Sequence, residues 1–153
     1  MKQSNALPSR DPLLIFSLAA ISFSFGFFSY LGIEKLYKSQ ISHSPTHWSM
    51  GLVAGLSFLF LLALDKKKLP LFVKAVAGGL FITLLELFAG IILNLHFHLG
   101  VWDYSRSFGD FKGQICPLFS LVWCAASFAV IAANRLLIRL VFYAFGEKTP
   151  FRG

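Results

Sequence analysis

The sequence predicts an all-α polytopic membrane protein, a bundle of four transmembrane helices with its N- and C-termini in the cytoplasm. Three observations lead to this fold class: the composition, the number of long apolar stretches and the placement of the basic residues. Of the 153 residues, 56% are hydrophobic and only 14% are charged. Such a chain is too apolar for a soluble domain, so the lipid bilayer is the expected surrounding.

Four stretches are long enough to cross a bilayer within a single integral membrane domain, residues 1–153. They span about residues 13–33, 48–64, 71–95 and 115–133. The first is uncharged and is longer than the apolar region of a secretory signal. Because no small-x-small cleavage site follows it before Glu34, we expect a retained helix.

The remaining three stretches differ in length and in what borders them. The second would reach only about 26 Å as a helix, so it must stand nearly upright. The third carries Lys74 near its start, where the long side chain can snorkel to the interface. The fourth is followed by a basic amphipathic continuation, 134–146, which either prolongs the helix or lies in the headgroup plane.

The basic residues predict the orientation and the kind of partner. With four spans, one side receives the larger set: Lys2, Arg10, Lys66, Lys67, Lys68, Lys74, Arg135, Arg139, Lys148 and Arg152. The positive-inside rule places that side in the cytoplasm, which leaves residues 96–114 as an outward-facing loop. The net charge of +7 then reflects topology signals and contacts with anionic membrane lipids, and we expect no nucleic acid partner.

Glu86 is the most informative residue, because it places a carboxylate inside the third apolar stretch. An unpaired carboxylate at bilayer depth costs several kcal/mol, so this residue predicts either a functional site or a buried structural contact. The nearest expected partners are Arg106 and His96 or His98, if the following loop folds back.

Small and polar residues follow the helical period on two stretches. On the third they are Gly79, Thr83, Glu86, Gly90 and Asn94, and on the fourth Cys116, Ser120, Ser127 and Asn134, with Trp123 beside them. We predict that the two seams face each other or a shared cavity. A packing role is expected for Gly51, Gly55, Gly79, Thr83, Gly90 and Ser120.

The loop of residues 96–114 contains the other cluster of polar and charged residues. The residues predicted to serve function or a transport pathway are Glu86, Asn94, Trp102, Asp103, Tyr104 and Arg106. No phosphate-binding loop, nucleophile elbow or paired-histidine zinc motif occurs, so the catalytic residues of an enzyme are left unassigned. His96 and His98 are expected at the interface; a metal site that they complete with Glu86 or Asp103 is the alternative, which spacing does not decide. Neither a metal nor another cofactor is predicted. Cys116 and Cys124, eight apart on one helix, lie too far apart for a disulfide.

Several of these motifs together resemble a known family. The segment from Glu86 to Asn94, the run Trp102-Asp103-Tyr104-Ser105, the segment from Gly113 to Cys116 and Trp123 are similar to the CmpB-type ABC-transporter type IV family, which includes the eukaryotic transmembrane protein 229 group. The resemblance covers about residues 46–134. It implies a transport or transport-associated protein, with a separate ATPase or transport subunit as a partner.

Three hypotheses about function follow. The first is a small transport protein in a bacterial cytoplasmic (inner) membrane, a homo-oligomer because four helices enclose little room, with Glu86 as its intramembrane site and Asp103 and Arg106 at the outer mouth. The second is a membrane-embedded enzyme acting on a lipid or an isoprenoid, with Glu86 or Asp103 as acid or base. The third is a scaffold whose polar seams only join helices.

Overall fold

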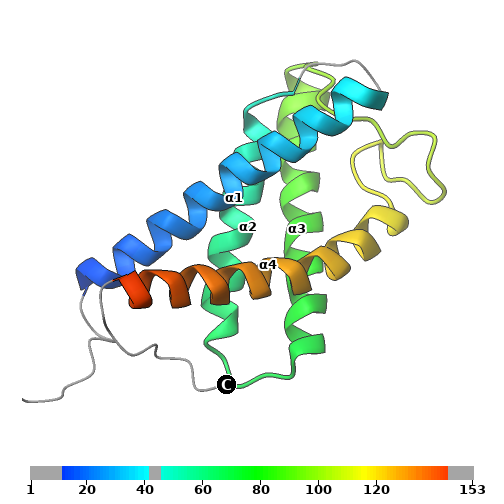
Figure 1. Cartoon of the computed structure of the whole chain (residues 1–153). Coiled ribbons are helices and arrows are strands. Elements are labelled where there is room, and N and C mark those ends of the chain that lie inside the picture. The colour runs from blue at the N-terminus through cyan, green and yellow to red at the C-terminus, as the bar shows by residue number, and fades with distance from the viewer. Residues whose placement is uncertain (1–11, 42–45, 145–153) are drawn as a thin grey trace, which may run out of the picture.

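The computed structural model describes residues 12–41 and 46–144, and within these ranges the chain is all-helical apart from turns and one isolated bridge. Figure 1 shows α2 (Ser49–Asp65) and α3 (Leu71–Gly90) side by side, with α1 (Pro12–Ile41) and α4 (Pro117–Ala144) crossing them obliquely. A π-helical segment, η1 (Ile91–His96), prolongs α3. α1 packs mainly on α2 and α4 mainly on α3, so two helix pairs make the bundle.

The lengths and compositions of the helices fit a membrane protein. Pro12–Gln40, Leu71–His96 and Pro117–Ala144 are long and apolar enough to cross a bilayer, and α2 is a shorter apolar helix of 17 residues. Large apolar side chains on these helices point outward, among them Phe16, Phe28 and Phe72, which are each at least 70% exposed. Such apolar surfaces suit contact with lipid. The chain is therefore an integral membrane protein, and its described residues form four α-helices.

Two helix ends differ from the predicted ranges because local interactions, rather than hydropathy, set them. α1 continues eight residues past Ile33, where Glu34 and Lys38 form an ion pair of 2.8 Å one turn apart. α4 begins at Pro117 rather than at residue 115, because Phe111 and Ile115 form a β-bridge and a proline suits the first turn of a helix.

The basic continuation prolongs the last helix instead of bending away. α4 runs without a break to Ala144, while residues 145 and 146 of the predicted continuation lie outside the described residues. Its apolar residues Ile138 and Phe142 pack with Leu62 of α2, and Leu14 and Leu18 of α1 cover this cluster. The start of α1 and the end of α4 therefore meet at the α2–α3 turn end of the bundle (Figure 1).

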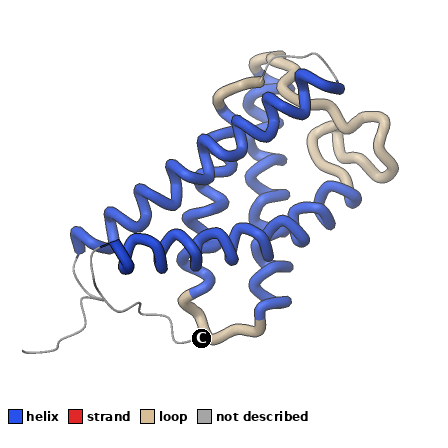
Figure 2. Tube along the Cα trace, viewed as in Figure 1, coloured by secondary structure: helices blue, strands red, loops and turns tan. Residues whose placement is uncertain are grey.

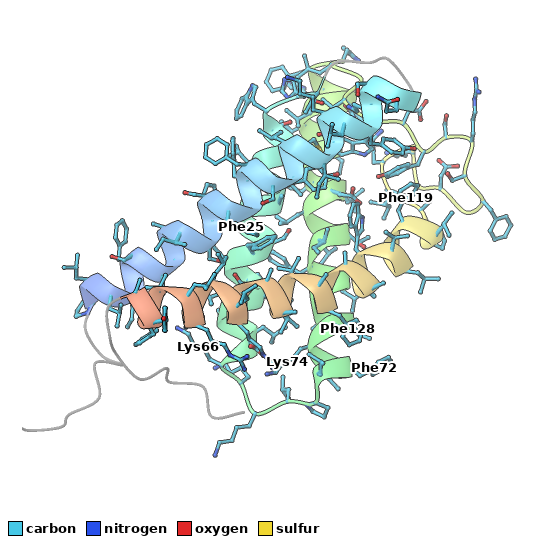
Figure 3. All side chains as sticks on the ribbon, in the orientation of Figure 1. Phe25, Lys66, Phe72, Lys74, Phe119 and Phe128 are labelled. Carbon is cyan, nitrogen blue, oxygen red and sulfur yellow. The ribbon has the colours of Figure 1, made fainter. Side chains whose placement is uncertain are left out.

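The connections place the loop and the α2–α3 turn at opposite ends of α3. Figure 2 shows a short tan turn joining α2 to α3 and a long tan loop between η1 and α4. In Figure 3, Lys66 and Lys74 mark the turn end, whereas Phe119 lies close to the loop. This separation leaves one polar network at each end of the bundle.

Candidate functional site

Glu86 lies inside the bundle and is held by two neutral donors. Its side chain belongs to α3 and is 1% exposed. The indole Nε1 of Trp123, on α4, donates to Oε2, and the hydroxyl of Tyr104, in the loop, donates to Oε1 at 3.2 Å. The carboxylate therefore joins α3, α4 and the loop at a single point.

The partners expected for Glu86 from the sequence were wrong. Arg106, His96 and His98 are exposed in or beside the loop. Within residues 12–41 and 46–144, the carboxylates that form ion pairs are those of Glu34 and Asp65, not that of Glu86. The loop does fold back, but it presents a phenol to the carboxylate instead of a cation.

Asn94 fixes the path of the loop that carries Tyr104. Its Oδ1 accepts the backbone N–H of Val101 at 2.7 Å, and its Nδ2 donates to the carbonyl of Trp102 and to Oε1 of Gln114, at 3.0 and 2.8 Å. The indole of Trp102 in turn donates to the carbonyl of Gln114 at 3.0 Å. Asn94 and Trp102 thus position the loop, and neither touches Glu86 in these bonds.

A backbone hydrogen bond and a ring contact fix the position of Tyr104. Its backbone N–H donates to the carbonyl of Gly113 at 2.8 Å, and its ring stacks on Phe119 with centroids 4.5 Å apart. Burial, followed by the nearby charge of Glu86, raises the pKa of Tyr104 above its ordinary value. The hydroxyl therefore stays protonated at neutral pH and remains a donor.

The side chain of Asp103 is exposed, and both of its carboxylate oxygens accept hydrogen bonds within a local turn. Its Oδ1 accepts the backbone N–H of Ser105 at 2.8 Å and its Oδ2 accepts the Ser105 hydroxyl at 3.0 Å. These two bonds hold the pKa of Asp103 below its ordinary value. Gly113 packs against this turn with φ +70°, and an added Cβ would come within 2.8 Å of Oδ1, so both space and backbone require glycine.

The predicted seam on α3 contacts α4 and the loop, but largely at residues outside the second predicted seam. Asn134 of that second seam bonds α1 and α2 instead. A Cβ added at Gly79 would lie 2.6 Å from the backbone nitrogen of Cys124 and nearer still to its Sγ, so the backbones of α3 and α4 approach closely there. A Cβ at Gly78 would instead meet side chains, those of Leu61 on α2 and Ser127 on α4, and a Cβ at Gly90 would meet the Gln114 side chain. Gly51 and Gly55 contact the rings of Phe27 and Phe23 on α1 instead, while Thr83 and Ser120 bond carbonyls of their own chain four residues earlier, at 2.9 and 3.0 Å.

A cavity of about 90 Å³ lies between the four helices, with Glu86 on its wall. The other wall residues are almost entirely apolar or aromatic and include Tyr30, Met50, Phe58, Ile82 and Trp123. The sequence identified Glu86 and Trp123 as seam residues but gave no sign of Tyr30 or Phe58, because neither interrupts an apolar pattern. Glu86 is thus an acidic residue on the wall of a cavity whose exposed surface is almost entirely apolar.

A second buried polar cluster was missed and ties three helices at the α2–α3 turn end. Asp65 accepts Lys74 Nζ at 2.8 Å and also accepts two bonds from Arg135, at 2.7 and 2.8 Å. Lys74 is 5% exposed and also donates to the Asp65 carbonyl, so it does not snorkel as expected. The i, i+9 spacing of Asp65 and Lys74 across a short turn was the available sequence signal.

Asn134 makes a third buried connection between helices. Its Nδ2 donates to the carbonyl of Phe58 at 3.0 Å, and its Oδ1 accepts the hydroxyl of Ser22 at 2.6 Å. In the described part of the chain, no group of three or more His, Cys, Asp and Glu side chains is arranged to hold a metal ion. Cys116 and Cys124 are free thiols.

Comparison with known proteins identifies the family. The family model described as "Putative ABC-transporter type IV" matches residues 21–149, which is most of the chain. No curated protein and no solved structure matches the chain. The matched range includes Glu86, the loop and Trp123, and the chain therefore belongs to this ABC-transporter type IV family of membrane proteins.

Proposed function

We propose that this chain is a transport or transport-associated protein of a bacterial cytoplasmic membrane, in which Glu86 binds the coupling proton. The observation that carries this proposal is Glu86, an acidic side chain with 1% exposure on the wall of a cavity between all four helices. Among the described residues, its carboxylate is bonded by two neutral donors. Intramembrane carboxylates on cavities are typical of ion and proton pathways. The family description points in the same direction.

The proposal includes an orientation and partners. Both termini would lie in the cytoplasm, because the exposed residues Lys66, Lys67 and Lys68 share the α2–α3 turn end with the start of α1 and the end of α4. A homo-oligomer, with or without a separate ATPase or transport subunit, would supply the room that one bundle of four helices lacks. Asp103 and Arg106 would then border the outer mouth.

A scaffold role is the second candidate, because the same contacts support it. The bonds of Glu86 to Trp123 and Tyr104 join α3, α4 and the loop, as a purely structural clamp would. A scaffold predicts that replacing Glu86 lowers stability in step with any loss of function, whereas a transport site predicts a folded, abundant and inactive variant.

A measurement of proton flux into vesicles distinguishes the transport role from the scaffold role. The chain would be reconstituted with any subunit that native mass spectrometry shows to copurify, and proton entry would be followed with an internal pH-sensitive dye under an imposed potassium diffusion potential. Glu86→Gln should reduce flux to the level of protein-free vesicles while keeping its melting temperature. The matched control is Glu34→Gln, because Glu34 is also a helix carboxylate but already pairs with Lys38 at 2.8 Å.

Each outcome decides between the candidates. Flux in the Glu34→Gln control should equal that of the unaltered protein. Unchanged flux in Glu86→Gln, or no flux above protein-free vesicles for the unaltered assembly, would contradict the transport proposal. A fall in flux that only tracks a fall in the amount of folded Glu86→Gln would favour the scaffold.

A further inference from the structure

We propose that the cavity beside Glu86 is a binding site for a small organic monocation, an ammonium ion that carries a short apolar substituent. This inference rests on the proposed function of the same site and names the class of ligand. It is argued from charge, wall chemistry and size.

The charge of the site calls for one positive charge. The indole of Trp123 and the phenol of Tyr104 are neutral, so they bond the carboxylate of Glu86 without cancelling its charge. A buried charge is stable only when it is paired or neutralised, so either a proton or a monocation must complete the site. Each carboxylate oxygen accepts one bond in the structure and has a further lone pair for an ammonium N–H.

The chemistry of the wall favours an organic over an inorganic cation. A metal ion would need several oxygen ligands, and the described residues hold no cluster of three or more acidic, histidine or cysteine side chains. Away from Glu86, the wall is formed by carbon-rich residues such as Met50 and Ile82, which gain by covering an apolar substituent. The rings of Tyr30, Phe58 and Trp123 also belong to this wall, and aromatic faces attract ammonium groups.

The volume limits the size of the ligand. The cavity measures about 90 Å³, compared with an engineered cavity of about 150 Å³ that holds benzene with its six heavy atoms. By proportion, the site takes about four heavy atoms. Isopropylammonium has that size, and isopropanol is its neutral counterpart of nearly the same shape.

The test measures binding of these two probes by isothermal titration calorimetry to the purified full chain in nanodiscs. Isopropylammonium should bind saturably, with a dissociation constant of about 40 µM or weaker, because four heavy atoms supply at most about 6 kcal/mol. It should compete with protons for Glu86, so binding should weaken as the pH falls and should release protons in a weakly buffered solution. Isopropanol should bind at least tenfold more weakly.

Two variants, each with a control, test whether isopropylammonium binds in this cavity. Glu86→Gln should lose at least tenfold in isopropylammonium affinity, and Glu34→Gln should keep it. Ala126→Leu should also abolish binding, because Ala126 lines the cavity and the added carbons would fill it while Glu86 remains. Ala129→Leu is its control, since Ala129 is exposed on the same helix. The Ala126→Leu result keeps the test valid if Glu86→Gln fails to fold.

The outcomes separate this inference from the proposed function. Equal affinity for isopropanol and isopropylammonium, or binding that survives both Glu86→Gln and Ala126→Leu, would overturn it. If proton flux depends on Glu86 but isopropylammonium does not bind, the ligand class is wrong and the transport role stands. If binding depends on Glu86 but no flux occurs, the ligand site stands and the transport role fails.

Discussion

At the scale of single residues, the carboxylate of Glu86 depends on donors that come from different parts of the chain. Trp123 reaches it from the next helix, while Tyr104 reaches it from a loop that Asn94 holds in place. Hydrogen bonds to charged groups are stronger than those between neutral groups, and a buried carboxylate has no water to replace a lost donor. The two bonds should therefore contribute measurably to stability.

Trp123→Phe tests the stronger of these bonds. The substitution keeps an aromatic ring in the wall but removes the indole N–H, so Glu86 retains only the bond from Tyr104. We expect the free energy of unfolding to fall by about 1–2 kcal/mol. The measurement is denaturation by titrated SDS in mixed micelles, followed by circular dichroism.

Trp102→Phe provides the comparison, because it removes an indole bond to a neutral acceptor, the carbonyl of Gln114. Its cost should be about 0.5–1.5 kcal/mol, the usual value for a neutral hydrogen bond. A Trp123→Phe variant as stable as the unaltered protein would show that the bond to Glu86 contributes nothing.

The sequence could reveal Glu86 but not the residues that surround it. A carboxylate in an apolar run stands out by composition alone, and the helical period places it on one stripe with Gly79, Thr83 and Gly90. Its partners could not be chosen, because Arg106 and Tyr104 lie two residues apart in one loop and only the fold decides which points inward. Electrostatics favoured the arginine, whereas the Asn94 network turns the tyrosine toward the carboxylate.

At the scale of elements, α3 and α4 approach closely because glycines line their contact. The backbone nitrogen of Cys124 would lie 2.6 Å from a Cβ at position 79, and its Cα 2.7 Å away. Backbone atoms cannot move aside as a flexible side chain can, so the helices themselves would have to separate.

Gly79→Ala should therefore destabilise the bundle, despite the better helix propensity of alanine. We expect a loss of about 1–3 kcal/mol in the free energy of unfolding, the usual cost of overpacking. Gly32→Ala is the matched control, because Gly32 lies on α1 with nothing within 4 Å of an added Cβ. The control should be neutral or stabilising by up to about 1 kcal/mol. Equal stability of the two variants would mean that α3 and α4 do not pack as described.

The ion cluster at the α2–α3 turn end makes the next prediction at this scale. Asp65 and Lys74 are 8% and 5% exposed, so removing the carboxylate leaves a buried ammonium without its counter-ion. Asp65→Asn should cost about 3 kcal/mol. Arg135→Gln should cost under about 1 kcal/mol, because that side chain is 42% exposed and partly screened by solvent.

The comparison of these two variants is made by the same SDS titration. Lys68→Met serves as a control, since Lys68 is exposed in the turn itself and should leave stability unchanged. A loss for Arg135→Gln as large as that for Asp65→Asn would contradict the view that Lys74 is the charge that depends on Asp65.

Helix existence was predictable, and helix ends were less so. A long apolar run indicates a segment that contacts lipid or the interior of the bundle. All four predicted runs coincide with helices. The continuation of α1 depends on the Glu34–Lys38 pair, and the start of α4 depends on the bridge between Phe111 and Ile115. Hydropathy carries no information about either interaction.

At the scale of the whole molecule, the two ends of the bundle differ in charge. The α2–α3 turn carries the exposed Lys66, Lys67 and Lys68, with Arg139 exposed on the last part of α4. The opposite end carries the loop, where acidic and basic residues alternate along 103–112. Anionic lipid headgroups and the positive-inside rule both favour the lysine-rich turn on the cytoplasmic side.

Cysteine labelling in intact cells tests this orientation. In a background where Cys116 and Cys124 are replaced by alanine, Phe108→Cys places a thiol in the loop at a position that is 96% exposed. A membrane-impermeant maleimide should label it from outside. Lys67→Cys, in the exposed α2–α3 turn, should be labelled only after the cells are permeabilised. The reverse pattern would place the termini outside and the loop, with Asp103 and Arg106, on the cytoplasmic side.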